Sequence, residues 1–235
     1  MSIANRLREV TDSLPQGVRL VAVSKFHPAE YVKEAYDAGQ RVFGESREQE
    51  LSRKVEVLPK DIEWHFIGHL QTNKVKYIAP YISMIDAVDS LKLLREINKQ
   101  AAAHGRTIKV LLELHIAEEE TKYGLSLDAC RELLEGGEWR ELHNVQICGL
   151  MMMASHVDDE SLIRKEFMLA ADFFDEVKAR YFADDDAFCE RSWGMSQHAA
   201  HQVITSVCMA ERMQCIVFVN TKVLAGNKNS SGGSK

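Results

Sequence analysis

The chain has 235 residues, of which 46% are hydrophobic and 27% charged, and its formal net charge is −6. This length fits one α/β barrel or one large doubly wound domain, with two small domains as a further alternative. The negative charge argues against a non-specific nucleic-acid or anionic-membrane binder, and no apolar run is long enough to cross a bilayer.

Helical and strand patterns alternate from the start of the chain. Residues 1–14 predict an amphipathic helix and lack the apolar centre of a secretory signal. Short β-branched and apolar runs then predict eight strands, at Arg19–Ser24, Arg41–Gly44, Glu63–Gly68, Ser83–Val88, Ile108–Ile116, Val145–Met152, Phe188–Trp193 and Cys215–Leu224. Helical patterns lie between them at Ala29–Ala38, Glu45–Val57, Leu91–His104, which Ser90 can cap, and Glu160–Tyr181.

This order of elements predicts the fold. Eight strands that alternate with helices over this length indicate a single-domain (β/α)8 TIM-type barrel with an extra N-terminal helix. Several of the strands are almost continuously apolar, as strands buried on both faces are. The barrel is expected to span residues 1–226, followed by a flexible, Gly/Ser-rich tail over residues 227–235. An open doubly wound sheet is the alternative.

Cysteine and histidine spacing predicts neither a disulfide framework nor a metal site. The five cysteines are odd in number, widely spaced and form no CxxC pair, which is typical of reduced structural thiols. His65 and His69 are four residues apart, but they fall on a predicted strand and loop rather than on one helix face. With no secretory signal, these observations favour a cytoplasmic protein.

Lys25 directly follows the first predicted strand and is the sharpest candidate for chemistry. In an α/β barrel, residues after the carboxyl ends of the strands face the active-site mouth. A lysine there is partly desolvated, which favours the neutral amine that attacks an aldehyde. From position alone, a solvated loop lysine is the competing interpretation. The segment 192–196 (SWGMS) follows the seventh strand and can present N–H groups and hydroxyls to a phosphate.

At these same points the chain resembles the pyridoxal phosphate homeostasis proteins, single-domain barrels related to the N-terminal domain of alanine racemase. The resemblance covers roughly residues 1–196 and rests on ordered motifs, of which WHFIGHLQTNK and VAVSK are the most specific. The matching stretches are VAVSKFHP (21–28), FGESREQEL (43–51), EWHFIGHLQTNK (63–74), IDAVDS (85–90), KYGLS (122–126), CGLMMM (148–153) and SWGMS (192–196).

The resemblance implies that pyridoxal 5′-phosphate is the cofactor and that Lys25 binds it as a Schiff base. It further implies that Ser192 and Ser196 hold the phosphate, and that Glu45 and Ser46 lie near the cofactor, although the family more often has Asn at position 46. The remaining implied positions are His65 and Met151, which line the cavity, the loop His69–Lys74 above it, and His115, where the family usually has Asn.

After Ser196 the chain departs from the family pattern. Phe218 stands where the family has an arginine that faces the pyridine nitrogen, and Asn220 stands where it has a glycine beside the phosphate. Only Thr221 matches as a phosphate-binding hydroxyl. Part of the phosphate site is therefore expected to be absent or rebuilt, and natural divergence, a shifted reading frame and deliberate redesign remain open as the origin of this segment.

The resemblance implies a monomeric, non-catalytic protein that carries pyridoxal phosphate as a Schiff base and serves vitamin B6 homeostasis. Its expected partners are the cofactor and apo forms of pyridoxal-phosphate-dependent enzymes, with no nucleic acid and no membrane. A small amino-acid racemase or lyase is the alternative, and it needs a base opposite Lys25, for which Tyr123 is a candidate. A third alternative is an altered barrel with weakened cofactor binding.

Overall fold

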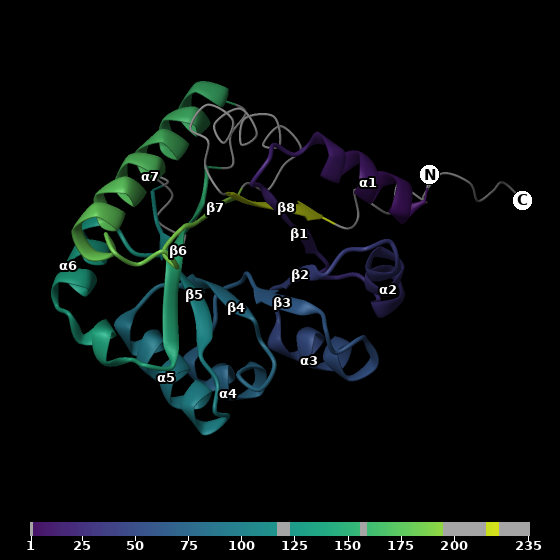
Figure 1. Ribbon diagram of the computed structural model, residues 1–235, viewed down its shortest axis with the longest axis horizontal. Helices are drawn as coiled ribbons and strands as arrows, with labels where there is room; N and C mark the ends of the chain where they lie inside the picture. The colour runs from purple at the N-terminus through teal and green to yellow at the C-terminus, as the bar shows by residue number, and fades with distance from the viewer. Residues whose placement is uncertain (1, 117–122, 156–158, 195–214, 221–235) are drawn as a thin grey trace, which may run out of the picture.

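A computed structural model of the protein describes residues 2–116, 123–155, 159–194 and 215–220. Eight parallel strands close into a barrel in chain order, with β8 returning to pair with β1 (Figure 1). The strands are β1 Arg19–Val23, β2 Val42–Glu45, β3 Glu63–Phe66, β4 Met84–Val88, β5 Ile108–Leu114, β6 Val145–Met153, β7 Glu190–Gly194 and β8 Cys215–Asn220. The prediction of a closed (β/α)8 barrel is confirmed, and the open doubly wound sheet is wrong.

Helices surround the barrel and connect successive strands. The α-helices are α1 Ile3–Ser13, α2 Ala29–Asp37, α3 Glu48–Val57, α4 Val75–Ile78, α5 Leu91–Ala103, α6 Leu127–Glu135 and α7 Glu160–Tyr181, with 3-10 turns η1 Thr72–Lys74 and η2 Glu138–Glu141. The expected extra N-terminal helix is α1, which lies outside the ring close to α2 (Figure 1). No helix within the described ranges is long and apolar enough to span a membrane.

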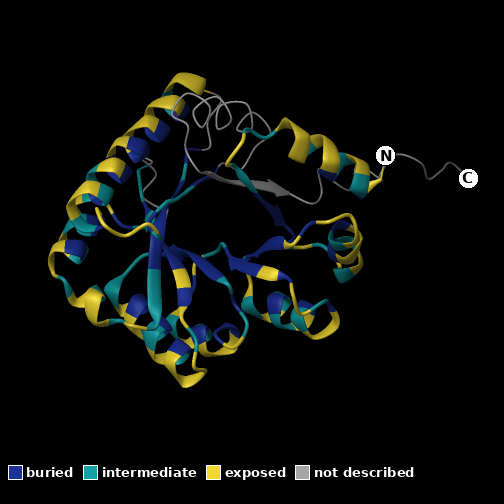
Figure 2. Ribbon diagram, in the orientation of Figure 1, coloured by how far each residue is buried: buried dark blue, intermediate teal, exposed yellow. Residues whose placement is uncertain are grey.

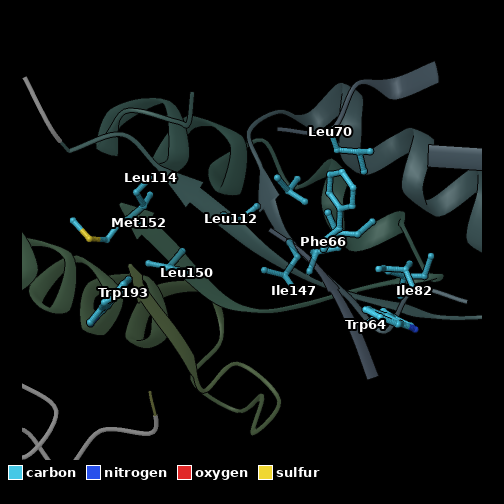
Figure 3. Packing of buried hydrophobic residues seen from close by; sticks show 14 of the residues in the cluster. Trp64, Phe66, Leu70, Ile82, Leu112, Leu114, Ile147, Leu150, Met152 and Trp193 are labelled. Carbon is cyan, nitrogen blue, oxygen red and sulfur yellow. The ribbon is translucent and has the colours of Figure 1, made fainter. Parts of the chain in front are cut away.

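Apolar side chains form two separate layers, one on each face of the barrel wall. The larger cluster lies between the strands and the helices and includes Trp64, Leu112 and Trp193 (Figure 3). The smaller cluster joins residues of strands on opposite sides of the ring, which can meet only inside the barrel: Val21, Val42, Met84, Ala87, Leu111, Cys148 and Met151. Figure 2 shows the result, with buried strands at the centre and exposed residues on the outer helix faces.

Helix starts follow from local side-chain caps. Ser90 Oγ accepts a hydrogen bond of 3.3 Å from the Leu93 amide and so caps α5, as the sequence predicts. Ser126 caps α6 in the same way, and Asp159 accepts hydrogen bonds from the first amides of α7. These caps fix where each helix begins relative to the strand before it.

One predicted boundary is wrong in a way that matters for the site. Glu45 was expected to begin the second long helix, but it is the last residue of β2, and α3 begins only at Glu48. In the sequence, a glutamate directly after an apolar strand predicts the start of a helix or a loop. It is stable here because its charge meets a partner from α3, a long-range contact that no local pattern reveals.

Candidate functional site

Lys25 lies at the carboxyl end of the barrel, in the turn that follows β1. Val21 belongs to the inner cluster, whereas Leu20 and Ala22 belong to the outer one, so side chains alternate across the wall. Lys25 itself comes two residues after the end of β1, in the turn where this strand leaves the carboxyl end of the barrel. Its side chain is half-buried and has no hydrogen-bond or ion-pair partner among the residues that the structure describes. The amine predicted to be reactive thus has no partner within the described residues and belongs to a turn at the carboxyl end of the barrel.

The residue after Lys25 has an uncommon backbone conformation. Phe26 adopts φ +65°, in the left-handed region that bulky residues rarely enter, and the residue is 63% exposed. The Phe26 amide donates a 2.8 Å hydrogen bond to Glu50 Oε1, and the Arg47 guanidinium lies 4.8 Å from the ring centroid. Such strain persists only where the surroundings hold it, and it is often found at functional sites.

Beneath this turn lies a buried ion cluster that sequence reasoning missed. Lys54 Nζ donates to Glu45 Oε1 at 2.6 Å, to Glu50 Oε1 at 2.7 Å and to the Ser24 carbonyl at 2.8 Å. Ser24 Oγ also donates to Glu45 Oε1, at 2.6 Å. Burial raises the pKa of Glu45, and the adjacent Lys54 ammonium opposes that rise. The i, i+4 spacing of Glu50 and Lys54 on α3 was the signal available in the sequence.

Glu45, which the resemblance placed near the cofactor, has its carboxylate in this cluster on the outer side of the wall. The residue before it, Gly44, marks the inner side, because a Cβ there would meet Val21 and Ile67 at 3.1–3.2 Å. Alternation therefore turns Glu45 away from the barrel interior and toward α3. Its position favours a role in supporting the Lys25 turn.

Ser46 and Gly68 bring the loops after β2 and β3 into direct contact. Ser46, which the resemblance placed near the cofactor, is half-buried in the loop just past β2. A Cβ on Gly68 would lie 2.8 Å from both the Ser46 carbonyl oxygen and the Ser46 Cβ. Only glycine permits this approach without displacing backbone, which gives a physical reason for the glycine in the WHFIGH segment.

His65 lies on β3 and is 1% exposed, with its Nδ1 3.0 Å from Oδ1 of the equally buried Asp86 on β4. Both belong to the inner face, since they alternate with outer-cluster residues Trp64, Phe66 and Ile85. The predicted cavity-lining histidine is therefore already engaged by a carboxylate. Asp86 was not recognised as a functional candidate from the sequence.

A row of three registered residues crosses β5, β6 and β7 on the inner face. Glu113 pairs with Met151, and Met151 with Ser192, so the three side chains point to the same side of the wall. Met151, which the resemblance implies lines the cavity, belongs to the inner cluster. Ser192 is fully buried, and its Oγ has no hydrogen-bond partner in the described part of the chain.

Glu113, the third member of this row, also escaped sequence reasoning. Burial, with a contribution from the negative charge of Asp89, raises the pKa of its carboxyl to about 7. Its Oε2 is buried and finds no hydrogen-bond partner within the described ranges. The signal in the sequence was a single carboxylate inside the apolar run IKVLLELHI.

The loop after β3 forms the outer rim. His69 Nδ1 lies 3.2 Å from Asp89 Oδ2, and its ring stacks on Tyr123 with centroids 3.8 Å apart. Tyr123, the candidate base of the racemase alternative, is 59% exposed. The rim also holds an open pocket of about 390 Å³, lined by His69, Leu70, Gln71, Thr72, Asn73, Asp89, Ser90 and Leu93.

Two predicted phosphate ligands, Ser196 and Thr221, lie outside the described residues, as does the tail 227–235. Phe218 and Asn220, which depart from the family pattern, belong to β8, and the strand pairing gives the position of their backbone. Phe218 of β8 pairs with Val21 of β1, and Asn220 pairs with Val23, two residues before Lys25. The β8 strand that carries these departures is thus the immediate neighbour of the strand that carries Lys25.

Comparison with known proteins gives a consistent picture. Residues 1–207 match the family described as alanine racemase, N-terminal domain. A protein of Aquifex aeolicus named pyridoxal phosphate homeostasis protein is 35% identical over 198 residues, covering 83% of this chain and 85% of that protein. An Escherichia coli protein of the same name is 33% identical over 196 residues, covering 76% and 82% respectively.

Solved structures agree with these relatives. PipY of Synechococcus elongatus without pyridoxal phosphate superposes with a TM-score of 0.83 at 33% identity, over 95% of this chain and 100% of PipY. The PipY structure with pyridoxal phosphate bound gives a TM-score of 0.80 at 32% identity. An alanine racemase of Clostridium difficile, at 15% identity and a TM-score of 0.69, shares the barrel fold.

Proposed function

Because the chain belongs to the family of pyridoxal phosphate homeostasis proteins, we propose that it binds pyridoxal 5′-phosphate covalently through Lys25. The observation that carries the proposal is Lys25, without a partner among the described residues, in the turn after β1 of a barrel shared with PipY, whose structure holds this cofactor. An amine that no carboxylate engages is sterically available to an incoming aldehyde.

The chemistry requires only the amine of Lys25 and an aldehyde. The cofactor supplies an electrophilic aldehyde carbon and a dianionic phosphate when bound. The neutral Nζ of Lys25 attacks that carbon, a C–N bond forms, and the aldehyde oxygen departs as water with the two amine protons. Neither an oxidant nor a reductant is needed, and hydrolysis of the resulting Schiff base releases the cofactor.

The phosphate is proposed to meet the carboxyl end of β7. The buried, unpartnered Ser192 Oγ fits this task, because it has a hydroxyl proton free to donate to an anion. Ser196 and Thr221 are proposed as further hydroxyl donors on the basis of the sequence. Position 220 holds asparagine, whereas the family has a glycine that lets the backbone come close to the phosphate. We therefore propose that the affinity for the phosphate is modest.

We further propose that the protein is a monomer that carries the cofactor and delivers it to apo forms of dependent enzymes in the cytoplasm. The names of its relatives support a homeostatic role rather than turnover of a substrate. A racemase or lyase is the second candidate, and the observation in its favour is Glu113, whose carboxyl titrates near neutral pH on the inner face.

The test begins with the purified full chain and pyridoxal phosphate. The expected result is the visible absorbance band of a Schiff base, fixed by borohydride on the peptide that contains Lys25. Lys25→Ala should abolish both signals, whereas Lys33→Ala, which removes a half-exposed lysine paired with Asp37, should leave them intact. Absence of the band in the unmodified protein would overturn the proposal.

A panel of amino acids separates the two candidate functions. The carrier proposal predicts no change in the optical rotation of any amino acid over prolonged incubation with the loaded protein. Racemisation that disappears in both Lys25→Ala and Glu113→Gln would favour the catalytic alternative.

A further inference from the structure

The backbone on both sides of Lys25 is held by side chains of α3. The peptide before Lys25 is bound through its carbonyl, because Ser24 O accepts from Lys54 Nζ at 2.8 Å. The peptide after Lys25 is bound through its amide, because Phe26 N–H donates to Glu50 Oε1 at 2.8 Å. Lys54 and Glu50 are themselves joined at 2.7 Å. The orientations of these two peptide planes together set φ and ψ of Lys25.

We propose that Lys54 and Glu50 are positioning residues that fix the backbone of Lys25 and so aim its amine at the barrel mouth. The inference rests on the proposed function of Lys25. It goes further by assigning a role in cofactor capture to two residues of α3, which lie on the helix side of the barrel wall.

Burial of the cluster strengthens the hydrogen bonds that position the Lys25 backbone. The Lys54 side chain is 6% exposed and Glu45 is fully buried, so water does not compete for their hydrogen bonds. Glu45 Oε1 also accepts from Ser24 Oγ, which adds a second attachment on the side of Ser24. Without these attachments, the left-handed Phe26 would relax to a lower-energy conformation and turn Lys25 with it.

The same contacts explain why Lys25 rather than Lys54 meets the aldehyde. The three N–H groups of the Lys54 ammonium have three acceptors, Ser24 O, Glu45 Oε1 and Glu50 Oε1. An ammonium with all three protons engaged has no lone pair to offer as a nucleophile. Lys54 thus holds the backbone of the turn, and Lys25 is the lysine proposed to react.

The first test measures the turn itself, without cofactor. Glu50→Ala removes the acceptor of the Phe26 amide but leaves Lys54 paired with Glu45, so no buried charge is left uncompensated. Exchange of the Phe26 amide with deuterium should become about tenfold faster, the effect of one lost hydrogen bond. Glu50→Gln keeps an acceptor and should restore slow exchange. Glu56→Ala, which removes an exposed carboxylate from the same helix, is the matched control.

The second test measures capture. Under conditions where each variant is fully folded, Glu50→Ala should slow Schiff-base formation with pyridoxal phosphate by about tenfold to a hundredfold, and Glu50→Gln should stay close to the original rate. Borohydride should also label other lysines at the expense of Lys25. Lys54→Met is expected to be more severe, and if it fails to fold, the double variant Glu45→Gln, Lys54→Met removes both buried charges and replaces it.

The outcomes separate this inference from the proposed function. If the unmodified chain forms no Schiff base, the proposed function fails, and with it this inference. If the unmodified chain reacts but Glu50→Ala matches Glu56→Ala in rate and labelling, only the positioning role is overturned. Slower capture with selective labelling of Lys25 and rescue by Glu50→Gln supports it.

Discussion

At the scale of single residues, Glu113 makes stability depend on pH. The pKa of its carboxyl is about 7 in the folded chain, raised by burial from an ordinary value of 4.5. Between these two values the unfolded chain loses the proton first, so the free energy of unfolding falls as the pH rises. Below about pH 4.5 the carboxyl is protonated in both the folded and the unfolded chain, so its burial costs no stability. Above about pH 7 it is ionised in both, so the loss of stability no longer changes with pH.

Glu113→Gln should therefore stabilise the protein at pH 8 by at most about 3 kcal/mol and leave it nearly unchanged at pH 4.5. Urea unfolding of both proteins across this range measures the difference. Glu56→Gln, at an exposed site, should follow the unmodified chain at every pH. A constant difference between Glu113→Gln and the unmodified chain would contradict the assignment of the raised pKa to Glu113.

Ser192 gives a second prediction at this scale. If its buried Oγ donates to the cofactor phosphate, Ser192→Ala should weaken binding about tenfold, or about 1.4 kcal/mol, as a lost charge-assisted hydrogen bond does. The fold should not suffer, because that hydroxyl has no partner within the described residues. Equilibrium titration with pyridoxal phosphate measures the affinity, and titration with pyridoxal, which lacks the phosphate, should show no difference between the two proteins.

At the scale of the elements, capping decides where helices start. Ser90→Ala removes the side-chain acceptor at the start of α5 and should lower the free energy of unfolding by about 1 kcal/mol. Ser90→Asn supplies another acceptor and should lower the free energy of unfolding by only about a few tenths of a kcal/mol. Urea unfolding at neutral pH measures both, and equal losses in the two variants would show that the cap contributes nothing.

Strands and long helices were predictable because their apolar periods are strong and local. Val145–Met153 and Glu160–Tyr181 are examples, and the second was predicted to the residue. Short elements were not: α4 has only four residues, too few to show a period. Lys25 was found through its motif, whereas Lys54, Glu50, Asp86 and Glu113 were missed. Their significance comes from contacts between different strands and helices, which only the closed barrel creates.

At the scale of the whole molecule, one barrel implies one unfolding transition. The outer apolar cluster is continuous and includes both Trp64 on β3 and Trp193 on β7, which are 2% and 0% exposed. In a Trp139→Phe background, further Trp64→Phe or Trp193→Phe changes leave one tryptophan to report each half of the ring. In each variant, fluorescence and far-ultraviolet circular dichroism should give the same midpoint in urea. Separate midpoints for the two signals would instead show a partly folded intermediate, in which one half of the ring unfolds before the other.

The anchoring of the Lys25 turn by α3 limits how the proposed chemistry could be moved to another protein. A lysine placed after the first strand of a foreign barrel would lack the Ser24–Lys54 and Phe26–Glu50 contacts, and its direction would be left to chance. The smallest portable module is therefore the continuous segment 19–57, which contains the strand that leads into Lys25, the neighbouring strand and the helix behind them. For protein engineers, the unit of transplantation is two consecutive strand–helix repeats rather than a residue or a loop.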